Sequence, residues 1–173
     1  MAIKFKKITI KNKEKVFTDL VTNDVTQSSG ILKKESKQTT HKLPHNDLLR
    51  CFDKMVPHLV FSLGLAKTDD YECTPEWFSA FKYSDEPLME NIKVTGMTIG
   101  KDYLSIKLHG TIENYLGEES ELNSPSISLL DEGEEKYPLL QIIRENFDDL
   151  ITEATLYEEK EKYGISPQKE LQF

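Results

Sequence analysis

Residues 91–112, NIKVTGMTIGKDYLSIKLHGTI, contain the clearest pattern in the chain and are predicted to form a β-hairpin. In the second half, apolar and polar side chains alternate, and the apolar positions are Leu104, Ile106, Leu108 and Ile112. A period of two is typical of a strand with one buried and one solvent-exposed face. In the first half the alternation slips at Gly96, where a β-bulge would be tolerated. The residues from Gly100 to Asp102 are expected to supply the turn.

Two longer amphipathic stretches predict helices that cover the apolar face of this hairpin. The first covers residues 45–63, where apolar side chains recur at spacings of three and four. Pro57 lies inside this pattern and should kink the helix or divide it in two, because proline removes a helical hydrogen bond. The second helix is expected from about Pro138 to about Tyr163, with Gly164 as its stop.

The amino-terminal residues 2–11 are predicted to form a further strand. Its apolar positions change parity at Lys6 and Lys7, which indicates a second bulge. Charged side chains discourage aggregation at an open sheet edge, so the lysines favour an edge position for this strand. Residues 16–25 are a candidate for its antiparallel partner.

The remaining segments complete the predicted architecture. Residues 26–37 (TQSSGILKKESK) are polar and are expected to be a loop. Residues 122–130 (LNSPSISLL) are predicted to be a strand in which Pro125 requires an edge position or a bulge. The prediction is therefore a single α+β domain over residues 1–164, with an antiparallel sheet of about five or six strands and two main helices packed on one face. Residues 165–173 are expected to be a flexible C-terminal tail.

Composition fits a globular protein with a core. The chain has 173 residues, of which 38% are hydrophobic and 30% are charged, which is polar but far from the composition of disordered chains. No apolar stretch is long enough for a signal peptide or a membrane-spanning helix, so no membrane association is expected. Two cysteines, Cys51 and Cys73, are too few for a disulfide framework. We interpret them as reduced thiols in a cytoplasmic protein.

Charge is unevenly distributed along the chain. Residues 1–50 carry a net charge of +6 and residues 51–173 a net charge of −14, which gives the overall value of −8. Residues 117–161 contain 14 acidic and 3 basic side chains. The simpler interpretation is a solvated acidic surface; the alternative is an inhibitor that mimics nucleic acid through this region. Direct nucleic-acid binding is not expected, because the acidic half would repel phosphates.

No motif in the sequence supports catalysis, a metal site or a cofactor. His41, His45 and Cys51 could contribute to a zinc site, but no Cys-x-x-Cys accompanies them, and exposed or capping histidines are the favoured interpretation. Cys51 is expected to be a half-buried structural residue and not a nucleophile. A metal-dependent hydrolase would need several carboxylates that converge in a pocket. The sequence therefore predicts a non-enzymatic protein.

The last six residues, QKELQF, contain the most specific functional signal. Gln168, Leu171 and Phe173 resemble the peptide by which bacterial replication and repair proteins bind the DNA sliding clamp. The resemblance implies that the Gln168 amide makes hydrogen bonds and that Leu171 and Phe173 fill an apolar pocket. Lys169 differs from the leucine that is common at the second position. The alternative is that Leu171 and Phe173 fold back onto this domain.

The whole chain also resembles small uncharacterised proteins encoded by phages and prophages. The stretches that carry this resemblance are IKFKKITIK, LPHNDLLRCF, the central hairpin, LNSPSISL and the closing helix with its tail. It implies an accessory protein with no defined activity. The functional hypothesis is therefore a phage or mobile-element protein that binds a host protein, with the sliding clamp as the candidate partner.

Overall fold

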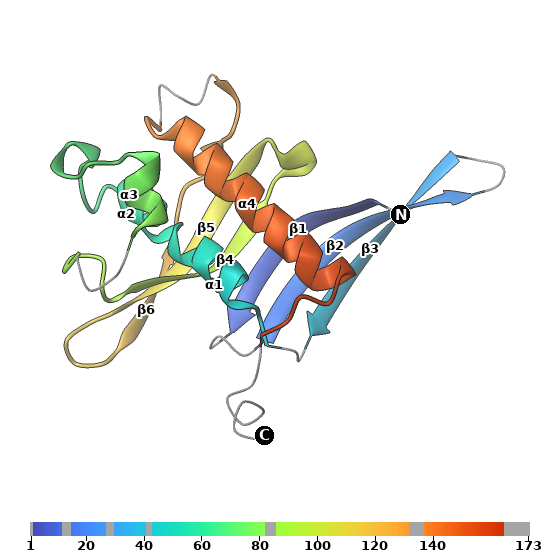
Figure 1. Ribbon diagram of the computed structural model, residues 1–173, viewed down its shortest axis with the longest axis horizontal. Helices are drawn as coiled ribbons and strands as arrows, with labels where there is room; N and C mark the ends of the chain where they lie inside the picture. Colours follow the sequence, from blue (N-terminus) through green and yellow to red (C-terminus); the bar gives the residue numbers. More distant parts are fainter. Residues whose placement is uncertain are drawn as a thin grey trace.

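The computed structural model describes residues 2–11, 15–26, 30–40, 43–81, 86–131 and 137–164. In this structure one antiparallel sheet is covered on one face by helices (Figure 1). The predicted α+β class is therefore confirmed.

The predicted hairpin consists of β4 (Ile92–Ile99) and β5 (Ser105–Glu113), which pair antiparallel. The pairing register shifts between Val94 and Gly96, so the bulge expected near Gly96 is present. A short 3-10 helix, Lys101–Tyr103, connects the two strands. Leu104, which the alternation predicts on the buried face, is 46% exposed, because it still belongs to this connection and precedes the start of β5.

The other strands extend the sheet on both sides of the hairpin. They are β1 (Ala2–Lys11), β2 (Lys15–Thr26), β3 (Gly30–Thr40), β6 (Glu119–Asn123) and β7 (Ile127–Ser128). The strand order is β3-β2-β1-β4-β5-β6, and the short β7 also pairs with β5. Six strands thus form the continuous path, at the upper limit of the predicted number.

The prediction that β1 lies at an edge is wrong. β1 pairs with β2 along most of its length and with β4 through the stretch around Ile8, so it is an interior strand. The bulge predicted at Lys6 and Lys7 is confirmed, since the register with β2 shifts between Phe5 and Lys7. Lys4 and Lys7 are exposed. They need no sheet edge, because the face opposite the helices is open to solvent.

Two further expectations about strands need correction. Most of the predicted loop over residues 26–37 is a strand: residues 30–37 belong to β3 (Gly30–Thr40), which pairs with β2 along its whole length. Main-chain hydrogen bonds form such a ladder whatever the side-chain pattern. Because this segment lacks apolar alternation, the sequence did not predict the strand. Residues 122–130 are divided between β6 and β7, and Pro125, which cannot donate a main-chain hydrogen bond, lies in the interruption.

The helices cover one face of the sheet as predicted. The first predicted helix is divided into α1 (Asn46–Asp53) and α2 (Val56–Ser62), with Pro57 in the first turn of α2. A short helix, α3 (Pro75–Ser79), packs beside α2, and the long helix α4 (Leu140–Glu159) crosses the sheet diagonally (Figure 1). None of the described helices is both long enough and apolar enough to span a membrane.

The core lies between these helices and the sheet. Its fully buried members include Ile8, Met55, Leu59, Met97, Leu108, Ile143 and Leu150.

Two arginines bind the connections around this core. The guanidinium of Arg50 donates to the main-chain oxygens of Ser79 and Phe81 at 2.6 and 2.5 Å, so α1 is tied to the end of α3. Arg144 donates to the Leu129 oxygen at 2.6 Å and thereby ties α4 to the segment after β7.

Candidate functional site

The residues predicted to bind a partner, Gln168, Leu171 and Phe173, lie outside the described residues, which end at Gly164. The structure does describe the segment that leads into this tail. Residues 160–164 run from the end of α4 back along the residues that precede α1, Leu43 and Pro44. The candidate site is therefore the segment around Gly164, the last described residue before the C-terminal peptide, and we call this point the exit.

The helix before this exit ends earlier than predicted. α4 ends at Glu159, and the main-chain N–H groups of Lys160 and Lys162 both donate to the Leu156 oxygen, at 2.9 and 3.2 Å. Between them Glu161 adopts a left-handed conformation with φ of 54°. This reversal occurs at Glu161 and not at Gly164, so the prediction that Gly164 stops the helix is wrong.

Gly164 instead allows a close approach between two chain segments. Its N–H donates to the Leu43 oxygen at 2.7 Å, and the preceding Tyr163 forms an isolated antiparallel bridge with Pro44. A Cβ atom on Gly164 would lie 2.4 Å from the Pro44 oxygen, so only glycine fits here. The Tyr163 ring packs edge-on against Tyr157 at a centroid distance of 5.0 Å. The exit thus has a fixed position on the body.

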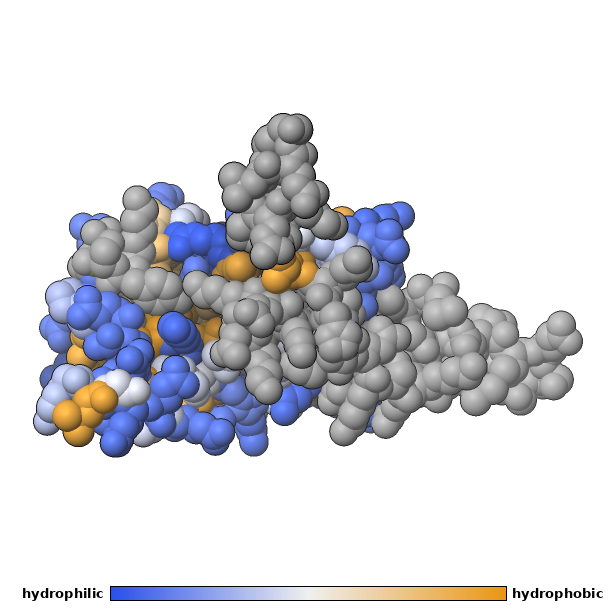
Figure 2. Space-filling model, turned by 90° about the horizontal axis from the view of Figure 1, so that it is seen from below, coloured by the Kyte–Doolittle hydropathy of each residue, from blue (hydrophilic) through white to orange (hydrophobic). Residues whose placement is uncertain are grey.

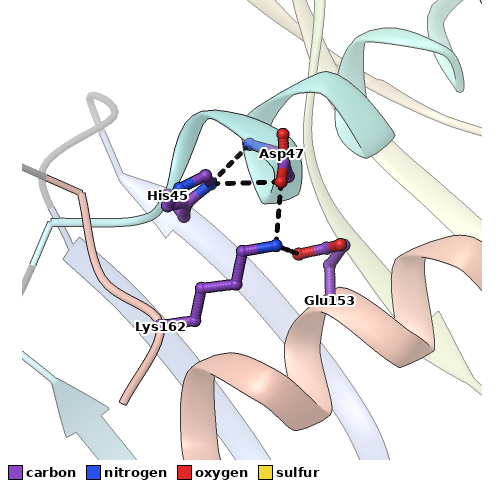
Figure 3. A network of polar contacts seen from close by, with 4 residues as sticks. All are labelled: His45, Asp47, Glu153 and Lys162. Atoms are coloured by element: carbon purple, nitrogen blue, oxygen red, sulfur yellow. Dashed lines mark hydrogen bonds and ion pairs between the residues drawn. The ribbon is translucent and has the colours of Figure 1, made fainter. Parts of the chain in front are cut away.

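Charged side chains add a second anchor at the exit (Figure 3). The Lys162 ammonium donates to Asp47 Oδ2 at 2.8 Å and to Glu153 Oε2 at 2.9 Å. Its hydrogen bond to Asp47 lowers the pKa of that carboxyl and raises the pKa of Lys162. His45 accepts a hydrogen bond from the Asp47 N–H at 3.0 Å and so caps α1. The network joins the start of α1, the last turns of α4 and the exit.

The structure describes two of the three residues considered for a zinc site, His45 and Cys51. His41 lies outside the described residues, and His45 acts as the helix cap, as the favoured interpretation proposed. Cys51 is buried, and its burial raises the pKa of the thiol to about 11, which keeps it protonated and unreactive near neutral pH. Within the described ranges, no group of three or more His, Cys, Asp or Glu side chains could hold a metal ion.

A buried polar cluster was missed by the sequence analysis. His58 has no exposed surface, and it lies between Tyr137 and Asn146. The Asn146 amide donates to His58 Nε2 at 2.9 Å, so Nδ1 carries the proton and donates to the Tyr137 hydroxyl at 2.5 Å. Phe78 stacks on the imidazole at 4.4 Å. The available signal was a histidine inside the apolar stripe of residues 45–63, but its partners come from distant segments.

This cluster is structural. Burial lowers the pKa of His58 to about 3, so the imidazole stays neutral. Burial also raises the pKa of Tyr137 far above its usual range. Both groups are buried, and both ring nitrogens of His58 have protein partners, which is the arrangement expected of a polar group in a stable core.

The open face of the sheet carries a polar row across three strands. His109 on β5 donates from Nδ1 to Asn123 Oδ1 of β6 at 2.6 Å, and its Nε2 lies 2.6 Å from the Thr98 hydroxyl of β4. Both ring nitrogens therefore have protein partners. The row joins neighbouring strands in the manner of other cross-strand side-chain pairs.

The acidic region of residues 117–161 is only partly available to a partner. On α4 the side chains of Glu145, Asp148 and Asp149 are exposed, whereas Glu153 accepts a hydrogen bond from Lys162.

No family model, curated protein or solved structure matches this chain.

Proposed function

We propose that this chain is a non-enzymatic accessory protein of a phage or mobile element that binds a host protein, the DNA sliding clamp, through its C-terminal peptide. Gln168 is the polar anchor, and Leu171 and Phe173 are the apolar side chains that fill the pocket. The observation that carries the proposal is the anchored exit: Gly164 is held against Leu43 and Pro44 directly before these residues.

An anchored exit suits a peptide that binds in a groove. Residues 165–173 can reach about 30 Å from Gly164 when fully extended. The three residues before Gln168 can span about 10 Å, a tether long enough for the six-residue peptide to reach a groove on a partner. A short tether attached to a rigid domain also keeps the peptide at a high local concentration beside any second contact on the same partner.

Binding to a purified bacterial sliding clamp tests this proposal. We expect the intact chain to bind with micromolar affinity and a chain that ends at Pro167 to show no binding by titration calorimetry. Leu171→Ala/Phe173→Ala should weaken binding by about 100-fold or more, since such apolar anchors dominate peptide affinity. The matched control is Ile165→Ala, which lies before the six-residue peptide and should bind as the intact chain does. Absence of binding by the intact chain would contradict the proposal.

Lys169 provides a test in the opposite direction. Lys169→Leu introduces the side chain that is common at the second position of clamp-binding peptides, so we expect it to tighten clamp binding by about threefold to tenfold. Lys169→Gln, which removes the charge without adding the apolar side chain, is the control. Equal affinities for Lys169→Leu and Lys169→Gln would mean that the tail does not bind as this family of peptides does.

A second candidate function is supported by the exposed acidic surface of α4. We propose, as the alternative, that Glu145, Asp148 and Asp149 occupy a basic nucleic-acid site on a host protein. Reversal of these three charges to lysine should then abolish binding to that protein and leave clamp binding intact. Glu153 is unsuitable for this test, because its loss would also disturb the anchor at Lys162.

A further inference from the structure

The turn between β5 and β6 displays two large apolar side chains to solvent. Tyr115 is 98% exposed and Leu116 is 72% exposed, the highest values among the large apolar residues of the described chain. Neither side chain contributes to the core. Folding therefore gives no reason for an apolar pair at this position, where polar residues would serve a turn equally well.

The turn itself is firmly built. Asn114 Oδ1 accepts hydrogen bonds from the N–H groups of Leu116 and Glu118 at 2.9 and 3.0 Å. The main chain of Asn114 also bonds to that of Glu118, at 2.9 Å, and to that of Gly117, at 3.0 Å, with Gly117 in the left-handed region at φ of 80°. The apolar pair is thus presented on a preorganised support, which reduces the entropy cost of binding.

The surroundings of the apolar pair are acidic. Glu113, Glu118, Glu119 and Glu121 are all exposed in the strand ends and the turn. No lysine or arginine occurs between Lys107 and Lys136. An apolar centre with a negative rim fits a protein pocket with basic residues at its edge. It does not fit an anionic membrane surface, which attracts basic segments.

The topology places this turn at the same end of the sheet as the tail exit. β3, β1 and β5 run in the same direction, because each pair of neighbours along the path is antiparallel. The C-terminal ends of β5 and β3 therefore lie at the same end of the sheet. The turn follows β5 there, and β3 leads to Leu43, whose main-chain oxygen accepts the hydrogen bond from Gly164. Figure 1 shows both features along the lower margin of the molecule. Figure 2 looks onto this side and shows an apolar patch at its left-hand end, where the β5–β6 turn lies.

The two features are close enough for one partner. Four inter-strand spacings of about 4.8 Å separate β3 from β5, so the lateral distance is of the order of 20 Å. A standard interface that buries about 800 Å² on each partner is roughly 30 Å across. A single protein surface that faces this end of the sheet can therefore contact both the turn and the peptide.

We propose that the β5–β6 turn is a second contact for the partner that takes the C-terminal peptide. Tyr115 and Leu116 enter an apolar pocket of the partner, and the surrounding glutamates face basic residues at the pocket edge. This inference rests on the proposed function, because it names the same partner, the sliding clamp. The two contacts act as a bivalent attachment, in which the peptide provides the first anchor and the turn fixes the orientation of the body.

The test is a titration of the sliding clamp with full-length variants. Tyr115→Ser/Leu116→Ser should weaken binding by about tenfold relative to the intact chain. The matched control is Leu104→Ser/Leu130→Ser, which removes two exposed leucines from the opposite end of the sheet and should leave affinity unchanged. Glu118→Gln/Glu119→Gln should weaken binding by about threefold at low ionic strength and by less at high ionic strength, because salt screens exposed charges.

The outcomes separate this inference from the function on which it rests. If the tail variants lose binding while Tyr115→Ser/Leu116→Ser binds as tightly as the intact chain, the turn is not a contact and the peptide proposal stands. If the intact chain does not bind the clamp, the proposed function fails and this inference fails with it. Urea unfolding of the turn variant, with an unchanged midpoint, confirms that a loss of binding does not come from misfolding.

Discussion

Replacement of Gly110 by alanine is expected to lower the free energy of unfolding by about 3 kcal/mol or more. Gly110 lies on β5 opposite Val94 of β4, and a Cβ atom at this position would lie 2.1 Å from the Lys93 main-chain oxygen. It would also lie 2.9 Å from Leu59 Cδ2 on α2. Leu59 can adjust its side chain, but the Lys93 oxygen can move only if the two central strands separate.

The measurement is the midpoint of urea unfolding. A loss of this size is a large part of the total stability of an ordinary domain, about 5–15 kcal/mol, so much of the Gly110→Ala protein should be unfolded before moderate urea concentrations are reached. Gly117→Ala is the matched control, because its Cβ would meet nothing closer than Glu113 Oε1 at 3.9 Å. Its φ of 80° should still cost about 1–2 kcal/mol. Equal losses in the two variants would contradict the close packing at Gly110.

Acidification from pH 7 to pH 5 is expected to remove about 2 kcal/mol of stability through His58. Burial lowers the pKa of this imidazole to about 3 in the folded protein, whereas the unfolded chain has the ordinary value of about 6.5. The unfolded state therefore binds more protons in this range. The stabilisation is complete above pH 6.5, declines as the pH falls below it, and is exhausted near the folded pKa of about 3.

Urea unfolding at pH 7, 6 and 5 measures this effect. His58→Gln should be less stable than the intact chain at pH 7, because it loses the stacking on Phe78 and the hydrogen-bond geometry with Tyr137. Its stability should nevertheless change far less between pH 7 and pH 5. A pH dependence that survives in His58→Gln would assign the acid sensitivity to other groups.

Only part of the candidate site could be predicted from the sequence. The tail residues Gln168, Leu171 and Phe173 could be proposed from the sequence alone, because a peptide motif is contiguous. The anchor at Lys162, Asp47 and Glu153 could not, because its members are up to 115 residues apart. The exposed pair at the β5–β6 turn could not be predicted either, because a pattern of apolar residues does not report which of them fail to reach the core.

The sequence by itself determined the elements whose signals are local. Alternation in residues 104–112 identified β5, although Leu104 itself precedes the strand. A parity slip located the bulge near Lys6, and Pro57 indicated the division between α1 and α2. These features follow from the conformational preferences and the side-chain periodicity of neighbouring residues.

Only the tertiary structure decided the rest. It placed β1 in the interior of the sheet, formed β3 from a polar segment, enclosed His58 between Tyr137 and Asn146, and set Gly164 against Pro44. Each of these depends on main-chain or side-chain partners that are distant along the chain. Strand order, burial of a polar group and close backbone approach are properties of pairs of segments, and a one-dimensional pattern of hydrophobicity contains no information on which segments meet.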